Sequence, residues 1–248
     1  MRIRWYPAIA LVFALLAVPA LAQNQPADTV RTLLAAGRLA SVVGMPIYFR
    51  LYRAHLPAAQ HSSYTVSNTM VYGMSGDLTI DIGGKAQSLA AGVGALIPAG
   101  ELTTISAPGP EPANFLLFVL SSRPNQGRPL LERPGVVQEM FRTEGPLTGL
   151  QSGPYEYSLT RVTMPAGMPV NPAHYRSGAA LYYVLAGTGA FAADGTTQPK
   201  PAGTPHFEPF GWVHQWANPG NAPLVLLQAN ISQEGIPAVL QGVPPATH

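Results

Sequence analysis

A repeated spacing of glycine and proline residues constrains the fold of this chain more than any other feature. Seven of these residues recur as the same residue type 111 positions later. The pairs are Gly76 and Gly187, Gly92 and Gly203, Pro98 and Pro209, Gly100 and Gly211, Pro108 and Pro219, Gly109 and Gly220, and Pro112 and Pro223. Because a turn glycine or proline answers a particular backbone dihedral angle, seven matches at one offset indicate two copies of one scaffold.

The repeated segments have the composition and alternation of β-strands. From Tyr48 onward, apolar and aromatic residues alternate with polar ones, and 25 Gly and 26 Pro punctuate the 248-residue chain. We expect strands at Tyr48–His55, Met70–Met74, Phe115–Leu120, Tyr157–Val162, Leu181–Leu185 and Leu224–Ala229. The last three strands repeat the order of the first three. The pattern therefore predicts a duplicated all-β protein.

The first 22 residues have the form of a secretory signal peptide. Arg2 and Arg4 precede an uncharged apolar run over Ala8–Ala20, and Ala20-Leu21-Ala22 is typical of a cleavage site. The alternative is an uncleaved membrane anchor, but the run is shorter than the roughly 20 residues that a span needs. We therefore expect a secreted or periplasmic protein with no membrane attachment after cleavage.

A short helix is expected next, within the N-terminal segment 23–44. Asp28 is a suitable N-cap, and Val30, Leu33 and Leu34 keep helical spacing. The linker between the two copies, residues 122–153, is expected to be partly helical over 130–142. Residues 233–248 are left as a C-terminal tail.

Composition excludes several classes of function. The chain has no cysteine, which rules out disulfides, thiolate nucleophiles and cysteine-ligated metal sites. Lys85 and Lys200 are the only lysines, so a basic surface for nucleic acid is not expected. Without Arg2 and Arg4 the mature chain has 12 basic and 12 acidic residues, so its net charge does not indicate a partner.

The second copy carries a recognisable motif. Gly203, Pro209, Gly211, His214 and Asn218 fall as G-x5-P-x-G-x2-H-x3-N. This resembles the second conserved motif of the cupin superfamily at every defined position. Through the 111-residue repeat, the resemblance implies a bicupin. Its two cupin-type barrels (double-stranded β-helix, or jelly roll) would lie in tandem at residues 45–121 and 154–232.

The first cupin motif is incomplete, and this bears on metal binding. The family's pattern is G-x5-H-x-H-x3,4-E-x6-G, and its two His and one Glu join the His of the second motif as metal ligands. Here His174 and His214 hold the first and last places, but Arg176 stands for the second His and Ala180 for the Glu. The resemblance thus implies a partial site, His174 and His214, for one divalent transition metal.

The positive charge of Arg176 disfavours a metal ion at this partial site. Two unit charges about 5 Å apart repel by roughly 3 kcal/mol at an effective dielectric constant of 20, and a dication doubles this. Arg176 beside the site therefore predicts weak metal binding or none. An arginine there can instead hold a carboxylate or phosphate in two hydrogen bonds, with His174 and His214 donating alongside.

The first copy has lost its ligand positions. The 111-residue offset places Ser63, Thr65, Thr69 and Thr103 at the four ligand places. His61, two residues before the first of these, either points inward or is a loop residue. His55 lies within a strand and is expected to be structural.

Strand alternation suggests further residues in the second copy. Tyr182 shares a face with Ala180, so it either contacts ligand or packs in the core. His206 and Glu208 share a face of the strand before Pro209. If that face is inner, they form an acid–base pair near His214, and if it is outer, they are surface residues. Trp212 and Trp216 flank His214 and either pack or wall the cavity.

Two hypotheses of function follow. The first is an exported bicupin that binds a small polar or anionic organic molecule in the C-terminal barrel through His174, Arg176, Tyr182 and His214. The alternative is a cupin-type enzyme with His174, Tyr182 and His214 as candidate catalytic residues. It would be a metal-dependent dioxygenase, decarboxylase or hydrolase, or a metal-free isomerase or epimerase. Cupins often pair through barrel faces, so the resemblance also implies a homodimer.

The expected signal peptide predicts where the mature chain begins. Cleavage after Ala22 should leave Gln23 as the first residue, free or cyclised to pyroglutamate. Intact mass and N-terminal sequencing of protein from the cell-envelope fraction measure this directly. Recovery of chains that begin at Met1 from the cytosol would contradict the prediction.

Overall fold

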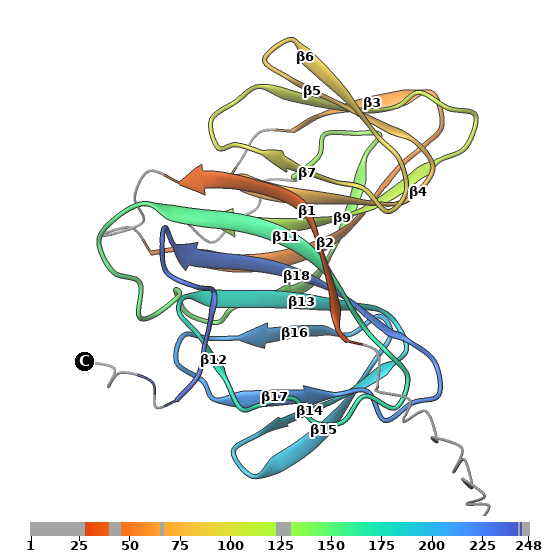
Figure 1. Ribbon diagram of the computed structural model, residues 1–248. Helices are drawn as coiled ribbons and strands as arrows, with labels where there is room; N and C mark the ends of the chain where they lie inside the picture. The colour runs from red at the N-terminus through yellow and green to blue at the C-terminus, as the bar shows by residue number, and fades with distance from the viewer. Residues whose placement is uncertain (1–27, 40–45, 65–66, 123–129, 243, 245–248) are drawn as a thin grey trace, which may run out of the picture.

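The computed structural model describes residues 28–39, 46–64, 67–122, 130–242 and 244. These residues form strands, turns and loops, with no helix among them and hence none that could cross a membrane. Two stacked halves are visible, each made of a large and a small sheet (Figure 1). The expected all-β, two-barrel fold is therefore confirmed. The expected signal peptide, residues 1–22, lies outside the described residues.

The first barrel is built from two sheets. One has the strand order β10-β2-β9-β4-β7 and the other the order β3-β8-β5-β6. The strands are β2 (Tyr48–Leu56), β3 (Gln60–Tyr64), β4 (Asn68–Ser75), β5 (Leu78–Ile82), β6 (Lys85–Leu89), β7 (Gly94–Ile97), β8 (Thr103–Ala107), β9 (Ala113–Ser121) and β10 (Val136–Arg142).

The second barrel repeats this plan. A five-stranded sheet of order β1-β11-β18-β13-β16 faces a three-stranded sheet of order β15-β14-β17, and β12 pairs with β19 beside them. The strands are β1 (Val30–Leu39), β11 (Tyr155–Met164), β12 (Tyr175–Arg176), β13 (Ala179–Ala186), β14 (Thr188–Ala193), β15 (Thr196–Pro201), β16 (Pro205–Glu208), β17 (His214–Ala217), β18 (Leu224–Gln233) and β19 (Val239–Leu240).

Two segments differ from the sequence-based expectation. Residues 30–39, expected as a helix, form strand β1, which pairs along its length with β11 of the second barrel. Residues 136–142 of the linker, expected to be partly helical, form β10 on the edge of the first barrel's sheet. In both segments, pairing to an available sheet edge overrides a weak local preference. Two of the three apolar residues with helical spacing, Val30 and Leu33, are exposed in this strand.

Close backbone packing fixes β1 in place. A side chain at Gly37 would run into Leu96 of β7, and one at Gly94 would meet Leu34 of β1. Two glycines thus allow β1 to lie against the first barrel while it pairs with the second. The N-terminal strand therefore bridges the two halves.

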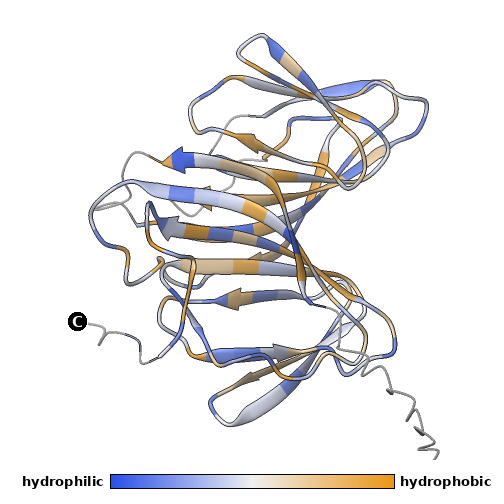
Figure 2. Ribbon diagram, in the orientation of Figure 1, coloured by the Kyte–Doolittle hydropathy of each residue, from blue (hydrophilic) through white to orange (hydrophobic). Residues whose placement is uncertain are grey.

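The large sheets of the two barrels pack against each other. The core between them contains Phe49, Leu51 and Phe118 from the first barrel and Tyr157, Leu181 and Ile231 from the second, all 0% exposed. Successive residues along β9 and β13 belong in turn to the shared core and to the interior of one barrel, and both sets are largely apolar. In β18 polar residues alternate with apolar ones from Gln228 on (Figure 2). One face of each sheet is thereby assigned to the shared core, and the other face lines the interior of its own barrel.

The shared core predicts that the halves unfold together. Leu181→Ala removes a fully buried side chain from it, which typically lowers the free energy of unfolding by about 2–5 kcal/mol. We expect one cooperative transition in both proteins, shifted to lower denaturant in the variant, measured by tryptophan fluorescence and circular dichroism. Two separate transitions in the wild type would show that the barrels are independent.

Candidate functional site

The side chains of interest lie inside the second barrel. On β13, Leu181 faces the shared core, whereas Ala180, Tyr182 and Val184 cluster with Phe191 and Trp216 in the barrel interior. The ring of Tyr182 lies 5.7 Å from that of Trp216, centroid to centroid. Tyr182 therefore lines the interior.

The neighbouring strand β16 places His206 and Glu208 on the same inner face. His206 is paired in register with Tyr182, and Glu208 with Ala180. Both side chains are buried, with Glu208 at 0% exposure. Of the two alternatives left open by the sequence, the inner face is correct.

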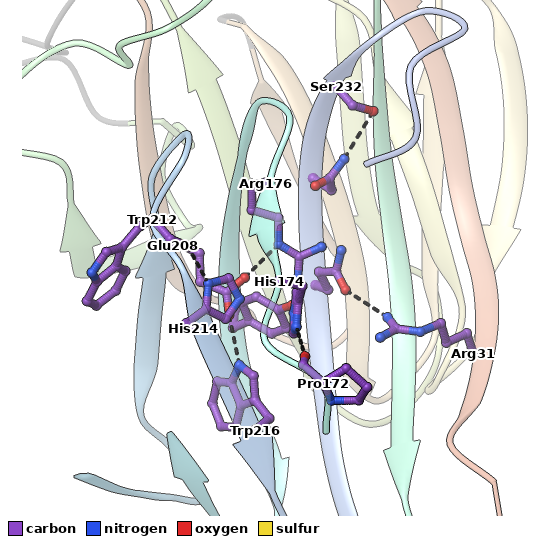
Figure 3. Close-up of polar contacts among 12 residues, drawn as sticks. Arg31, Pro172, His174, Arg176, Glu208, Trp212, His214, Trp216 and Ser232 are labelled. Carbon is purple, nitrogen blue, oxygen red and sulfur yellow. Dashed lines mark hydrogen bonds and ion pairs between the residues drawn. The ribbon is translucent and has the colours of Figure 1, made fainter. Parts of the chain in front are cut away.

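A buried ion pair connects β12 with β16. Nε of Arg176 donates to Oε2 of Glu208 at 2.7 Å, and both side chains are almost completely buried (Figure 3). Nη2 of Arg176 also donates to the hydroxyl of Tyr182. The indole Nε1 of Trp216 donates to the other carboxylate oxygen of Glu208 at 2.8 Å. The residue expected to hold a ligand thus has a counter-ion from the protein.

His174 and His214 are brought together as the motif implies. They form an antiparallel backbone bridge, and their ring centroids lie 4.4 Å apart. Nδ1 of His174 donates to the carbonyl of Pro172 at 2.9 Å, and Nδ1 of His214 to that of Trp212 at 2.8 Å. Because a carbonyl only accepts, these bonds assign the proton to Nδ1 in both rings. In the neutral ring, Nε2 then carries the lone pair.

Nε2 of His214 lies 3.1 Å from Oε1 of Glu208, but the two atoms are not oriented to form a hydrogen bond. Burial alone would raise the pKa of the Glu208 carboxyl, but the charge of Arg176, with the hydrogen bond from Trp216, lowers it below its ordinary value. Glu208 is therefore an anion at neutral pH and not a proton donor.

The other titratable groups are held uncharged. Burial lowers the pKa of His174 and brings that of His206 down to about 4. Burial also raises the pKa of Tyr182 well above its ordinary value. At neutral pH His174 and His206 are therefore neutral, Tyr182 is protonated, and Arg176 and Glu208 form an ion pair.

One polar wall of the interior was missed by the sequence analysis. On β18, Leu226, Gln228, Asn230 and Ser232 alternate with residues of the shared core, so they face inward. Nδ2 of Asn230 donates to Ser232 at 3.3 Å. The exposed Arg31 of β1 donates to Oε1 of Gln228 at 3.2 Å. A period-two polar pattern after Leu226 was the available signal.

The first barrel has apolar residues at the equivalent places. By the 111-residue offset, the counterparts of Glu208, Tyr182, Gln228 and Asn230 are Ile97, Val71, Leu117 and Val119, and all four belong to that barrel's buried apolar cluster. At these four places the second barrel is polar where the first is apolar.

One ligand position of the first copy needs correction. In the second barrel His174 faces His214, and in the first barrel the residue facing Thr103 is Tyr64, not Ser63. The loop of different length shifts the offset by one residue here. Tyr64 is fully buried and its hydroxyl bonds to Thr69, so its ring fills that position. Thr65 lies outside the described residues.

The histidines of the first barrel do not join a site. His61 is exposed on β3. Nδ1 of His55 lies 3.0 Å from Oδ1 of Asn114, which fits the structural role expected for His55.

The two tryptophans that flank His214 differ in burial. Trp216 is buried against Glu208, whereas Trp212 donates from its indole to Asp194 at 2.9 Å near the surface. Phe191 lies between them and the histidines, 4.0 Å from the ring of His206 and 5.5 Å from that of His214. The interior is thus polar on the β18 side and aromatic on the β14 and β17 side.

Comparison with known proteins agrees with this geometry. Residues 160–229 match the cupin domain family. The C-terminal barrel is a cupin domain. Oxalate decarboxylase from Bacillus subtilis is similar in structure, with a TM-score of 0.53 at 16% identity over 86% of this chain and 76% of that chain. AerE from Microcystis aeruginosa has a TM-score of 0.52 at 15% identity, over 84% of this chain and 99% of that chain.

At these identities the structural similarities establish the fold alone, and that fold is the bicupin. No curated protein sequence is similar enough to this chain to count as a match.

The donor set does not fit the metal that the cupin motif implies. No group of three or more His, Asp or Glu residues within the described ranges could hold a metal ion. Two imidazoles are present, but Arg176 takes the third place and binds the nearest carboxylate, that of Glu208. A dication added beside this guanidinium would be repelled by it.

The depressed pKa of His206 predicts a pH dependence of stability. As pH falls from about 6.5 towards about 4, the unfolded chain binds a proton on this imidazole that the folded chain excludes. The free energy of unfolding should therefore drop over this range, by up to about 3 kcal/mol. Urea titrations at pH 7, 5.5 and 4.5 measure the slope. His206→Gln should flatten it, whereas His61→Gln, at an exposed histidine, should not. Equal slopes in all three proteins would contradict the assignment.

Proposed function

We propose that this bicupin binds a small polar or anionic organic molecule inside the C-terminal barrel without a metal. The observation that supports this is a set of buried polar atoms with no hydrogen-bond partner. Of seven such side-chain atoms among the described residues, four belong to that barrel's interior: Arg176 Nη1, His206 Nε2, His214 Nε2 and Asn230 Oδ1. Proteins rarely leave buried polar groups unpaired, so these atoms favour a ligand or water between them.

The unpaired atoms favour a ligand that carries hydroxyl groups, with a carboxylate able to satisfy the Arg176 donor. Nη1 of Arg176 can only donate, whereas Oδ1 of Asn230 and the lone pair of a neutral imidazole accept. A hydroxyl group satisfies both kinds of atom. The aromatic side formed by Phe191 and Trp216 suits the apolar part of the same small molecule.

Charge near the interior supports an anionic ligand. Three cations are present: Arg176, Arg31 on β1 and Lys200, whose Nζ lies 5.8 Å from the Phe191 ring centroid. They are opposed by Glu208 and by Asp194, which binds Trp212. The excess positive charge, with Arg31 bonded only to an amide among its described contacts, favours a carboxylate at the β1 side.

A second candidate is a metal-free acid–base enzyme. His174 is neutral at pH 7 with Nε2 available as a base, and the raised pKa of Tyr182 keeps its phenol available as an acid. A cupin isomerase or epimerase with His174, Tyr182 and His214 would need these properties. Turnover of a bound ligand would favour this candidate over simple binding.

Export and pairing of two copies complete the proposal. The N-terminal pattern supports a secreted or periplasmic protein, and the homodimer is an expectation from the cupin resemblance. Sedimentation velocity of the mature chain tests the dimer separately from ligand binding.

Substitution by the first barrel's residue tests the ligand site. Asn230→Val places on β18 the residue that β9 has at Val119, and it removes an unpaired buried oxygen. We expect it to raise the free energy of unfolding of the unliganded protein by about 1–3 kcal/mol, the usual penalty of an unsatisfied group. We also expect it to abolish ligand binding, because function and stability conflict here.

The measurement is thermal stability with a panel of small carboxylates, hydroxy acids and polyols, together with native mass spectrometry for a co-purified molecule. The matched control is Asn114→Val on β9, whose side chain bonds to His55 and Ser75 outside the C-terminal barrel. It should leave ligand binding unchanged. If no compound stabilises the wild type and nothing co-purifies, the interior is a packed core and the proposal fails.

A further inference from the structure

We propose that the guanidinium of Arg176 is a permanent cation that replaces the metal ion in the C-terminal barrel, with Glu208 as its dedicated counter-ion. The two charged groups are 0% exposed and 2.7 Å apart. This inference concerns the cation of the site and goes beyond the proposed ligand binding, which does not require it.

The carboxylate reaches this place from an unexpected strand. The motif's Glu position is Ala180 on β13, whose methyl side chain occupies little space. Glu208 stands directly opposite Ala180 on the paired strand β16. The acidic group is thus at the same level of the barrel but one strand away. The first barrel has Ile97 there, so the acid at this place belongs to the second copy alone.

The carboxylate of Glu208 has a hydrogen-bond donor from the protein at each of its oxygens. Arg176 donates to Glu208 and Tyr182, and Trp216 donates to the remaining oxygen of Glu208. Both carboxylate oxygens are therefore occupied by N–H groups of the protein. A metal ion would have to displace these donors and approach a guanidinium of like charge.

The two histidines nevertheless keep the orientation of metal ligands. Each donates from Nδ1 to a backbone carbonyl, at 2.9 Å for His174 and 2.8 Å for His214. Such outer hydrogen bonds direct Nε2 towards a metal in proteins that bind one. The residue that prevents metal binding between these histidines is then Arg176, because its guanidinium occupies a ligand position. Arg176→His should add an imidazole and also release Glu208.

Cobalt binding tests this inference. Co²⁺ is titrated into wild type and Arg176→His and followed by visible absorption and by metal analysis after dialysis. We expect no stoichiometric Co²⁺ in the wild type. In Arg176→His we expect about one Co²⁺ per chain, with apparent affinity tighter by about 100-fold or more, as added imidazole and carboxylate ligands permit. Adding Glu208→Gln to this variant should reverse most of the gain.

Two further variants separate the cation from folding effects. Arg176→Met removes the charge without adding a ligand, so it should bind Co²⁺ more weakly than Arg176→His. Glu208→Gln leaves the guanidinium without a counter-ion and should lower the melting temperature more than Glu234→Gln. Glu234 makes an exposed ion pair with Arg38. Equal melting temperatures in these two variants would overturn the proposal even if Arg176→His does not fold.

The outcomes are distinct from those of the ligand tests. Stoichiometric metal in the wild type that is lost in both His174→Ala and Glu208→Gln would overturn the inference, while the ligand panel could still succeed. Likewise, a folded Arg176→His without any gain in Co²⁺ binding would overturn it. Failure of the whole ligand panel, with the metal results as expected, would leave the inference standing and reject the proposed function.

Discussion

The packing of the two large sheets against each other determines what the rest of this structure can do. Each large sheet has two faces, and one face of each contributes to the shared core. Leu51 and Phe118 come from the sheet of the first barrel, and Leu181 and Ile231 from that of the second. Since β-strand side chains alternate, this choice also fixes which residues enter each barrel. Tyr182, Glu208 and Asn230 are interior residues because their neighbours along the strands are needed between the barrels.

Duplication then allowed the two interiors to diverge. The first barrel has aliphatic side chains at the four places compared above and fills another with Tyr64, so it supplies stability and a packing surface. The second has polar residues at the same places, and four buried side-chain atoms of its interior are unpaired. Burying such atoms costs free energy, which a bound molecule can offset. The first barrel is therefore the structural copy, and the second is the copy whose interior is suited to a ligand.

The sequence alone was sufficient for the fold and for part of the candidate site. The constant glycine and proline spacing predicted the duplication, and the motif predicted that His174 and His214 meet. It did not predict that Glu208 pairs with Arg176, because the register of β16 against β13 decides which acid faces Ala180. Nor did it identify β1, whose helical spacing is overridden by a sheet edge that becomes available far along the chain.

Strand β1 also has a consequence for the order of assembly. Val30 pairs with Thr163 and Leu39 with Tyr155, so the first strand of the chain cannot find its partner until the first barrel, the linker and β11 have been made. Contacts between such distant residues slow folding, because a long loop must close first. An exposed, partly apolar strand that waits for its partner is prone to mispairing. Each new chain therefore has to keep residues 30–39 from pairing elsewhere while the first barrel and the linker are made.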